Sequence, residues 1–299
     1  GNQFDIHGGQ VSQDGTKLFH SFEQFGLNNG EVANFISNPN IENILGRIIG
    51  GDPSYIDGLL QVSGGDSNLF LINPAGIVFG SDASLNVPAS FTATTATGIG
   101  FENNHWFSAI GNNNWANLVG TPNTLQFSLA NPGAIVNQGN LAVPGGQTLS
   151  LIGGVVANTG SLHSPGGNLT LTAVPGASLV RLNAAGNVLS LELGQGDVLS
   201  PTPPSLPELL TGNSPIAQAS QIAVNPDGTV SLSGMRVNPL TGTTLISGNL
   251  SVAYTESSPI APPTIQILGD RIAAIDANLN AAATHTGGNI FIGGDFQGR

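Results

Sequence analysis

The sequence predicts an all-β fold of the solenoid type, in which short strands stack as successive coils. Three observations lead to this prediction. Apolar and polar residues alternate in short segments, similar segments recur at a spacing of about twenty residues, and paired glycines and asparagines separate them. A solenoid grows along one axis, so a length of 299 residues does not require two domains. We therefore expect residues 1–299 to form a single domain.

The repeat is clearest where residues 134–143 (AIVNQGNLAV) are aligned with residues 155–164 (VVANTGSLHS), which places Asn137 opposite Asn158. A third copy follows at residues 271–294, again with an Asn-rich turn, a Gly-Gly pair and alternating apolar residues. A period of this length suits one coil of a β-solenoid. Asparagines stacked in successive turns are expected to form ladders of side-chain amides.

Apolar residues alternate with hydroxyl residues inside each copy. Leu169 and Leu171 are separated by Thr170 and followed by Thr172. Successive side chains of a strand point to opposite faces, so we expect the leucines inside the solenoid and the threonines on a solvated outer face. One residue must be omitted after the Gly-Gly pair to bring Leu149 into register with Leu169.

Some segments lack this alternation. Residues 101–125 hold both tryptophans and show no coil pattern, and residues 201–220 are rich in proline. We expect both to be excursions from the solenoid rather than linkers between domains. An uncapped solenoid end would expose unpaired strand edges, so residues 1–35, which lie outside the visible repeat, are expected to form an N-terminal cap.

Charge is scarce in this chain. Lys and Arg total 6, Asp and Glu total 18, and the net charge is −12. Six scattered cations cannot neutralise a row of phosphates, which excludes nucleic acid as a partner. The absence of cysteine excludes disulfides, thiolate catalysis and zinc–sulfur sites. No apolar run is long enough for a membrane-spanning helix.

The sequence shows no pattern typical of an active site or a metal site. The five histidines are far apart, and the motifs HExxH, GxSxG and GxxxxGK[ST] do not occur. Asp52, Asp57 and Asp66 lack the ordered spacing of a calcium loop, and we interpret them as solvated loop acids. We therefore predict that the protein is not an enzyme and has no catalytic, cofactor-binding or metal-binding residues.

Two Asn-Pro motifs interrupt the strand-like segments near the N-terminus. The first is Asn38-Pro39-Asn40-Ile41, and the second is Asn73-Pro74-Ala75-Gly76-Ile77. Proline fixes φ and lacks an N–H, the residue before it is pushed toward extended geometry, and asparagine bonds its own downstream backbone. Each motif is therefore expected to form a stiff corner between strands.

In this order, and after LFHSFEQF at residues 18–25, the motifs resemble the N-terminal secretion domain of two-partner-secretion exoproteins, the filamentous-haemagglutinin-like family. The family motifs read Asn-Pro-Asn-Leu and Asn-Pro-Asn-Gly-Ile. Ile41 therefore keeps an apolar side chain, whereas Ala75 removes one amide. The resemblance is strongest over residues 1–100, and residues 287–298 are similar to the end of this domain in cyanobacterial members.

The resemblance implies a right-handed parallel β-helix with an N-terminal cap and extra-helical strands, and no enzymatic activity. It implies a domain that directs a large exoprotein to a cognate outer-membrane β-barrel of the TpsB type, whose POTRA domains recognise it. Export would run through Sec and the periplasm of a Gram-negative bacterium. The domain would then nucleate the β-helix outside the cell, in a secreted or surface-bound protein. Exposed strands suit such recognition by β-augmentation.

We expect the domain to be a monomer, and the residues of the two Asn-Pro motifs are the candidate site, either for recognition by the transporter or as structural turns. Two alternative functions stay open. One is a β-helical polysaccharide lyase or hydrolase, which the scarcity of Lys and Arg argues against. The other is an adhesin module that binds glycan or protein on another cell surface, for which exposed Trp106 and Trp115 would offer stacking faces.

Overall fold

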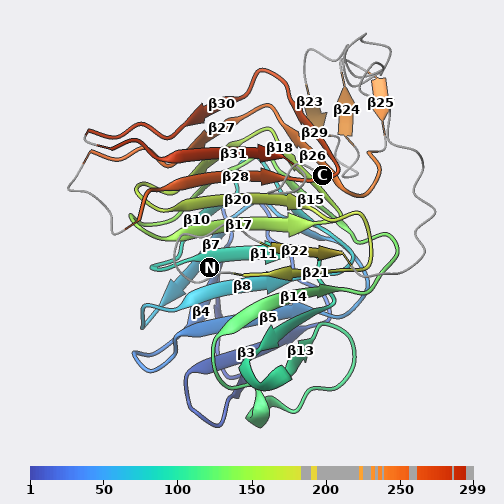
Figure 1. Ribbon diagram of the computed structural model, residues 1–299. Helices are drawn as coiled ribbons and strands as arrows, with labels where there is room; N and C mark the ends of the chain where they lie inside the picture. The colour runs from blue at the N-terminus through green and yellow to red at the C-terminus, as the bar shows by residue number, and fades with distance from the viewer. Residues whose placement is uncertain are drawn as a thin grey trace.

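The computed structural model describes residues 1–182, 190–193, 222–224, 230–232, 235–237, 239–255, 261–284 and 286–293. Within these ranges the regular structure is β-strand, apart from the short 3₁₀ helices η1 (Glu102–Asn104) and η2 (Trp115–Asn117). The strands stack as coils along one axis (Figure 1). The predicted excursion at residues 201–220 lies outside the described residues.

Each coil passes in turn through three sheets, here called B, C and A. Sheet A consists, in spatial order, of β1 (Gln3–Ile6), β4 (Val32–Ile36), β7 (Leu59–Ser63), β10 (Ser84–Asn86), β16 (Asn140–Ala142), β19 (Ser161–His163), β27 (Asn249–Ser251) and β30 (Asn278–Asn280). Sheet B consists of β2 (Gln10–Val11), β3 (Lys17–Phe22), β5 (Asn43–Ile48), β8 (Asn68–Ile72), β11 (Phe91–Thr94), β17 (Thr148–Gly153), β20 (Asn168–Ala173), β28 (Thr264–Leu268) and β31 (Asn289–Gly293). Sheet C consists of β29 (Arg271–Ala274), β26 (Thr243–Ile246), β18 (Val155–Asn158), β15 (Ala134–Asn137), β9 (Ile77–Phe79) and β6 (Ser54–Ile56).

All neighbouring pairs in these three sheets are parallel except β2 with β3. Parallel pairing between successive coils defines a parallel β-helix, so the predicted all-β solenoid is confirmed. The handedness stays a prediction.

The predicted register is also confirmed. Asn137 pairs with Asn158, as the alignment of the two copies requires. Leu149 pairs with Leu169, so the omission of one residue after the Gly-Gly pair was correct. The third copy continues the same column, because Arg271 pairs with Thr243 on the neighbouring strand of sheet C.

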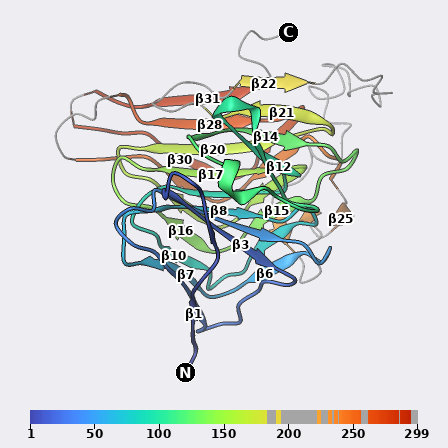
Figure 2. The ribbon, with the colours of Figure 1, turned by 90° about the horizontal axis from the view of Figure 1, so that it is seen from below.

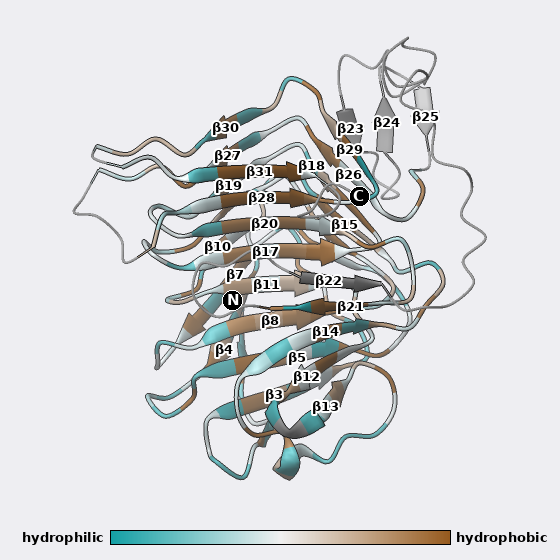
Figure 3. Ribbon diagram, in the orientation of Figure 1, coloured by the Kyte–Doolittle hydropathy of each residue, from teal (hydrophilic) through white to brown (hydrophobic). Residues whose placement is uncertain are grey.

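Apolar side chains fill the interior of the coils in columns. Leu149, Leu169 and Ile265 lie one above another on sheet B, and all three are fully buried. Figure 3 shows the hydrophobic character of β17 and β28 in this sheet. The column continues to Ile290 of β31, the terminal strand of sheet B, where the side chain is 42% exposed. Each additional coil therefore buries the apolar surface of the one before it.

The predicted amide ladder occurs at the corner between sheets C and A. Asn137 Nδ2 donates to Asn158 Oδ1 at 2.8 Å, and both residues are fully buried. The Oδ1 atom of Asn137 also accepts the backbone N–H of Gly139 at 3.1 Å. The ladder thus holds each corner closed and joins it to the next coil, which satisfies polar groups that burial would otherwise leave unpaired.

Glycines occupy the neighbouring position of the same corner in successive coils. The carbonyl oxygen of Gly139 accepts the N–H of Ser161, and that of Gly160 accepts the N–H of Asn249. A Cβ on Gly160 would overlap the carbonyl oxygen of Gly139, and a Cβ on Gly248 would overlap that of Gly160. Glycine is required here because the backbones of consecutive coils are in direct contact.

Two excursions leave the stack at the same corner, between sheets B and C. The first follows β11 and returns at β15, and the second follows β20 and returns at β26. Both contribute to an antiparallel sheet, sheet D, which consists of β13 (Trp106–Ser108), β12 (Gly98–Phe101), β14 (Pro122–Phe127), β21 (Ser178–Arg181) and β22 (Ser190–Leu193). The predicted excursion at residues 101–125 thus lies within β12 to β14. A separate antiparallel sheet is formed by β23 (Ile222–Val224), β24 (Val230–Leu232) and β25 (Met235–Val237).

The outer face of sheet B is buried, which corrects the expectation of a solvated face. Thr170 is 6% exposed and Thr172 is fully buried. Ile72 and Ile152 of sheet B belong to one buried cluster with Ile99 of sheet D, so sheet D packs on this face. Figure 2 shows β1 and the N-terminus on the side of the stack away from sheet D. Alternation alone cannot reveal this cover, because hydroxyl residues suit either environment.

The stretch predicted as a cap, residues 1–35, divides into two parts. β3 pairs in parallel with β5 over Lys17–Phe22 and is therefore already a strand of the stacked coils. The preceding residues cover the end of the stack, where β1 adds to sheet A and β2 runs antiparallel to β3.

We predict that Gly160→Ala lowers the free energy of unfolding by about 1–3 kcal/mol, because the new methyl group overlaps the Gly139 carbonyl. Gly145→Ala is the matched control. The nearest atom to a Cβ there is the Pro165 carbonyl oxygen at 3.6 Å, an ordinary contact. Urea denaturation of both variants checks the prediction, and equal midpoints would contradict direct backbone contact between coils.

Candidate functional site

The segment LFHSFEQF forms β3 and the turn after it, and its alternate side chains enter two different cores. Leu18 lies in the cluster that fills the solenoid, and Phe22 packs against the same cluster. Phe19 points the other way and belongs to the cluster shared with sheet D. This short segment therefore joins the interior of the β-helix to the excursion on its outer face.

The inward side of this segment is an aromatic cluster at the N-terminal end of the stack. The Phe22 ring lies 5.1 Å from Phe25 and 6.2 Å from Phe35, measured between ring centroids. The His20 ring is stacked on Phe22 at 6.0 Å. His20 is 6% exposed and packs as part of this cluster.

On the outward side, Arg47 of β5 holds the first excursion. Its Nε donates to Ser21 Oγ at 2.7 Å, and its Nη1 donates to the carbonyl oxygens of Ser108 at 2.8 Å and Gly111 at 2.7 Å. The guanidinium also lies 5.2 Å from the Trp115 ring centroid. Burial lowers the pKa of Arg47, but an arginine remains charged in proteins. Arg47 thus fastens residues 108–115 to the second coil.

Lys17 of β3 contacts the same excursion indirectly, through Asp14. Its Nζ lies 3.0 Å from Asp14 Oδ2, an atom that also accepts the backbone N–H of Gly120 at 3.3 Å. Partial burial raises the pKa of the Asp14 carboxyl. Hydrogen bonds from Ser12, Lys17 and the backbone of Thr16 and Gly120 outweigh this effect and hold the pKa well below its usual range. The carboxylate stays ionised and keeps this contact at any physiological pH.

The first Asn-Pro turn is exposed to solvent. Asn38, Pro39 and Asn40 are all exposed, whereas Ile41 is 4% exposed and belongs to the interior cluster. Asn38 Oδ1 accepts the N–H of Asn40 at 2.9 Å, and its carbonyl accepts the N–H of Ile41 at 3.0 Å. The motif is the predicted stiff corner, with Ile41 as its apolar anchor.

The next coil lies directly on this turn. A Cβ on Gly65 would overlap the carbonyl group of Asn38. The fully buried Ser67 donates from Oγ to the carbonyl oxygen of Ile41 at 2.5 Å and contacts Ser37 Oγ at 2.5 Å. The turn is therefore fixed from inside the stack, and its outer three residues remain accessible.

The second Asn-Pro turn packs into the stack, with Pro74 and Ala75 half-buried and the rest of the motif buried. Asn73 is 1% exposed, and its Nδ2 donates to the Asp52 carbonyl at 2.9 Å and to Ser54 Oγ at 3.0 Å. Its Oδ1 accepts the N–H of Ala75 at 3.0 Å. This last bond uses the backbone of position 75, so the replacement of asparagine by alanine leaves it intact. Asn73 therefore joins its own turn to the turn of the preceding coil.

The remaining residues of the second motif also lie against neighbouring parts of the stack. Ile77 and Gly76 are buried, and Gly76 has a φ of 133°. The Pro74 carbonyl accepts the N–H of Gly133 at 3.2 Å, where the chain returns from the first excursion. The structure does not bring the two motifs into one pocket. They lie at different corners, because the first precedes a strand of sheet B and the second follows one.

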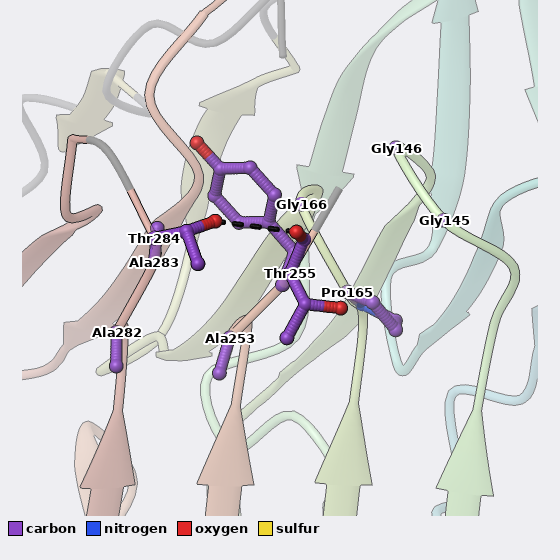
Figure 4. Close-up of a pocket in the computed structure, with 10 residues that line it drawn as sticks. Gly145, Gly146, Pro165, Gly166, Ala253, Thr255, Ala282, Ala283 and Thr284 are labelled. Carbon is purple, nitrogen blue, oxygen red and sulfur yellow. Dashed lines mark hydrogen bonds between the residues drawn. The ribbon is translucent and has the colours of Figure 1, made fainter. Parts of the chain in front are cut away.

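A groove runs across stacked turns between sheets A and B. The turns that carry Gly145, Pro165, Ala253 and Ala282 lie side by side there (Figure 4). Its described lining is small and neutral, with the Tyr254 ring and the hydroxyls of Thr255 and Thr284 as the larger polar groups. This lining has no carboxylate, imidazole or cation for acid–base chemistry.

The sequence alone did not reveal the roles of Arg47 and Trp115. The alternation of LFHSFEQF was a usable signal, because it places Phe19 and Ser21 on the outer face, where a covering element has to pack. Both tryptophans are half-buried rather than exposed. Trp115 lies 5.5 Å from Phe19, and a Cβ on Gly100 would lie 3.0 Å from the Trp106 ring.

Across the described residues, no three His, Asp or Glu side chains gather into a group suited to a metal ion. The same part of the chain contains no helix with the length and apolar character needed to cross a membrane.

Comparison with known proteins adds the family. A search of curated proteins finds no match. Among solved structures, the HMW1 secretion domain from Haemophilus influenzae is similar, with 20% sequence identity and a TM-score of 0.48 over 100% of this chain and 74% of that chain. The family model described as "TPS secretion domain" matches residues 1–198, more than half of the chain. The chain therefore belongs to the family of TPS secretion domains, the domains that mark exoproteins for two-partner secretion.

Proposed function

We propose that the POTRA domains of the cognate transporter recognise the first coils of this domain, and that the same coils nucleate the β-helix outside the cell. Family membership makes the chain the secretion-targeting domain of a two-partner-secretion exoprotein, exported across the outer membrane by a TpsB transporter. Beyond family membership, we assign recognition to the first coils and folding to specific contacts between them.

The contrast between the two Asn-Pro turns carries this proposal. Asn38, Pro39 and Asn40 are exposed, so their removal changes the surface more than the interior. Asn73 is buried, joins two coils through two hydrogen bonds, and closes its own turn through a third. We assign recognition to the first turn and folding to the second.

The end of sheet A next to the first turn supports recognition by strand addition. β1 is the terminal strand of this sheet among the described strands, so its outer edge offers unpaired backbone groups. Phe4 of this strand is 51% exposed. An extended segment of a POTRA domain can pair with such an edge, where main-chain bonds give affinity and alternate side chains give selectivity. The exposed turn then contributes polar contacts of its own.

The rest of the expected export route belongs to the same proposal. The chain passes through Sec and the periplasm before it meets the transporter, and the folded domain is a monomer without catalytic activity. Low charge supports this route, because few ionic groups have to be desolvated in a pore. The adhesin alternative gains no support from the tryptophans, because both rings are engaged in packing.

We predict that Asn73→Ala lowers the free energy of unfolding by about 2–3 kcal/mol, because it leaves the Asp52 carbonyl and Ser54 hydroxyl without their buried partner. Asn38→Ala removes a single exposed turn bond and is expected to lower it by less than about 1 kcal/mol. Chemical denaturation of the purified domain compares the two. Similar losses would contradict the division of roles.

We further predict that Asn38→Ala reduces transporter-dependent export of a reporter fused after residue 299, and weakens binding to the isolated POTRA domains by at least about tenfold, the effect of losing roughly one hydrogen bond. Asn29→Ala is the control, since Asn29 is exposed in another turn of the same coil. Wild-type export of the Asn38 variant, in a domain of wild-type stability, would rule out recognition at the first turn.

A further inference from the structure

His20 is a buried imidazole at the end of the hydrophobic interior. The residue is 6% exposed, and its Nε2 is fully enclosed and has no hydrogen-bond partner in the described structure. Buried polar atoms are ordinarily paired, so an unpaired one calls for an explanation. Hydrogen bonding does not explain the choice of histidine at this position, because an apolar side chain would fill the same space without an unpaired nitrogen.

Apolar groups and backbone surround most of the ring, including Nε2. Phe22 stacks on it at 6.0 Å, and the edge of Phe35 meets it at 5.8 Å. Above it in the stack lies Gly46, its partner on β5, which contributes no side chain. Below it, Gly9 lies so close that an added Cβ would be 3.0 Å from the His20 ring. Gly9 immediately precedes β2, so the covering segment rests on the imidazole.

Among the described residues, no charged side chain is bonded to this ring. The charged or titratable groups on the elements around it are Asp5 of β1, His7 before β2, Lys17 of β3, Glu31 before β4 and Arg47 of β5. Lys17 and Arg47 are bonded to groups on the outer face of sheet B. Asp5 is bonded to Asn34 on the outer face of sheet A, and Glu31 to the backbone of Asn28. His7 is exposed.

We propose that His20 is a proton-sensitive latch at the N-terminal end of the β-helix, and that its protonation releases Gly8–Val11 and opens the first coil. An imidazolium in this cavity would be an unpaired buried charge, which is far less favourable than the same charge in water. The covering segment is the part that can yield, because β2 consists of two residues and is held to β3 by one short antiparallel pair.

The direction of the pH dependence follows from this environment. Burial lowers the pKa of His20 from its ordinary value near 6.5. The opened state therefore takes up the proton first as pH falls. Above about pH 6.5 the closed state keeps its full stability. Below that pH, the ratio of closed to open molecules falls by up to tenfold per pH unit. The fall ends where the pH reaches the pKa of His20 in the closed state. This inference does not depend on recognition at the first Asn-Pro turn.

Hydrogen exchange of the intact domain between pH 7.5 and 5 tests the latch. After correction for intrinsic rates, we expect protection of the β2 and β3 amides to fall with pH, by up to tenfold per unit, while protection of β17 and β20 stays constant. His20→Phe removes the proton-binding group and is expected to abolish the fall. His20→Met serves the same purpose if the larger ring does not fit. His163→Gln, at an exposed position of β19, is expected to behave as wild type.

A second measurement needs no variant. The NMR titration of the histidine ring carbons is expected to show that His20 titrates below the ordinary histidine value near 6.5. The proposal is overturned if every ring titrates near pH 6.5, or if protection of β2 and β3 is independent of pH. It is equally overturned if the apolar variants keep the pH dependence, or if all strands lose protection together.

Discussion

The constraint on which this structure depends is direct backbone contact between consecutive coils. Parallel strands lie about 4.8 Å apart, so the corners between them stack at the same distance. At Gly160 and Gly65 the carbonyl of the coil below occupies the space of a Cβ. The corners therefore accept only glycine at these positions, and amides such as Asn73 and Asn158 bond the remaining polar groups from one coil to the next.

This constraint makes the first coil decisive for the rest. Every coil takes its register from its neighbour, and the first has only the short strands β1 and β2 on its outer side. Two of the chain's six cations, Lys17 and Arg47, are buried at this end. Both hold the first excursion, one through Asp14 and the other through Ser108 and Gly111. Among the described residues, the buried cations thus lie where the stack begins.

Much of the fold could be predicted from the sequence, because the same alternation that defines strands also defines the columns. The pairing of Asn137 with Asn158 follows from the spacing of the copies, and that of Leu149 with Leu169 follows from the alternation once one residue is omitted. The burial of Thr170 could not be predicted in this way, since it depends on a sheet assembled from segments far apart in the chain. The two Asn-Pro turns are alike in sequence, and they differ in exposure because the side chain of Asn73 is bonded to the preceding coil whereas that of Asn38 bonds only its own turn.

The excursion and the first coils also constrain the order of assembly. Residues 108–115 have no coil of their own. Their partners among the coils include Arg47 and Phe19, and the adjacent Ala116 accepts the N–H of Gln13 in the turn before β3. These partners precede the excursion in the chain, so its docking surface exists once the second coil has formed. The second excursion then adds β21 to β14 of the first. Such dependence of each segment on earlier ones favours folding from the N-terminus.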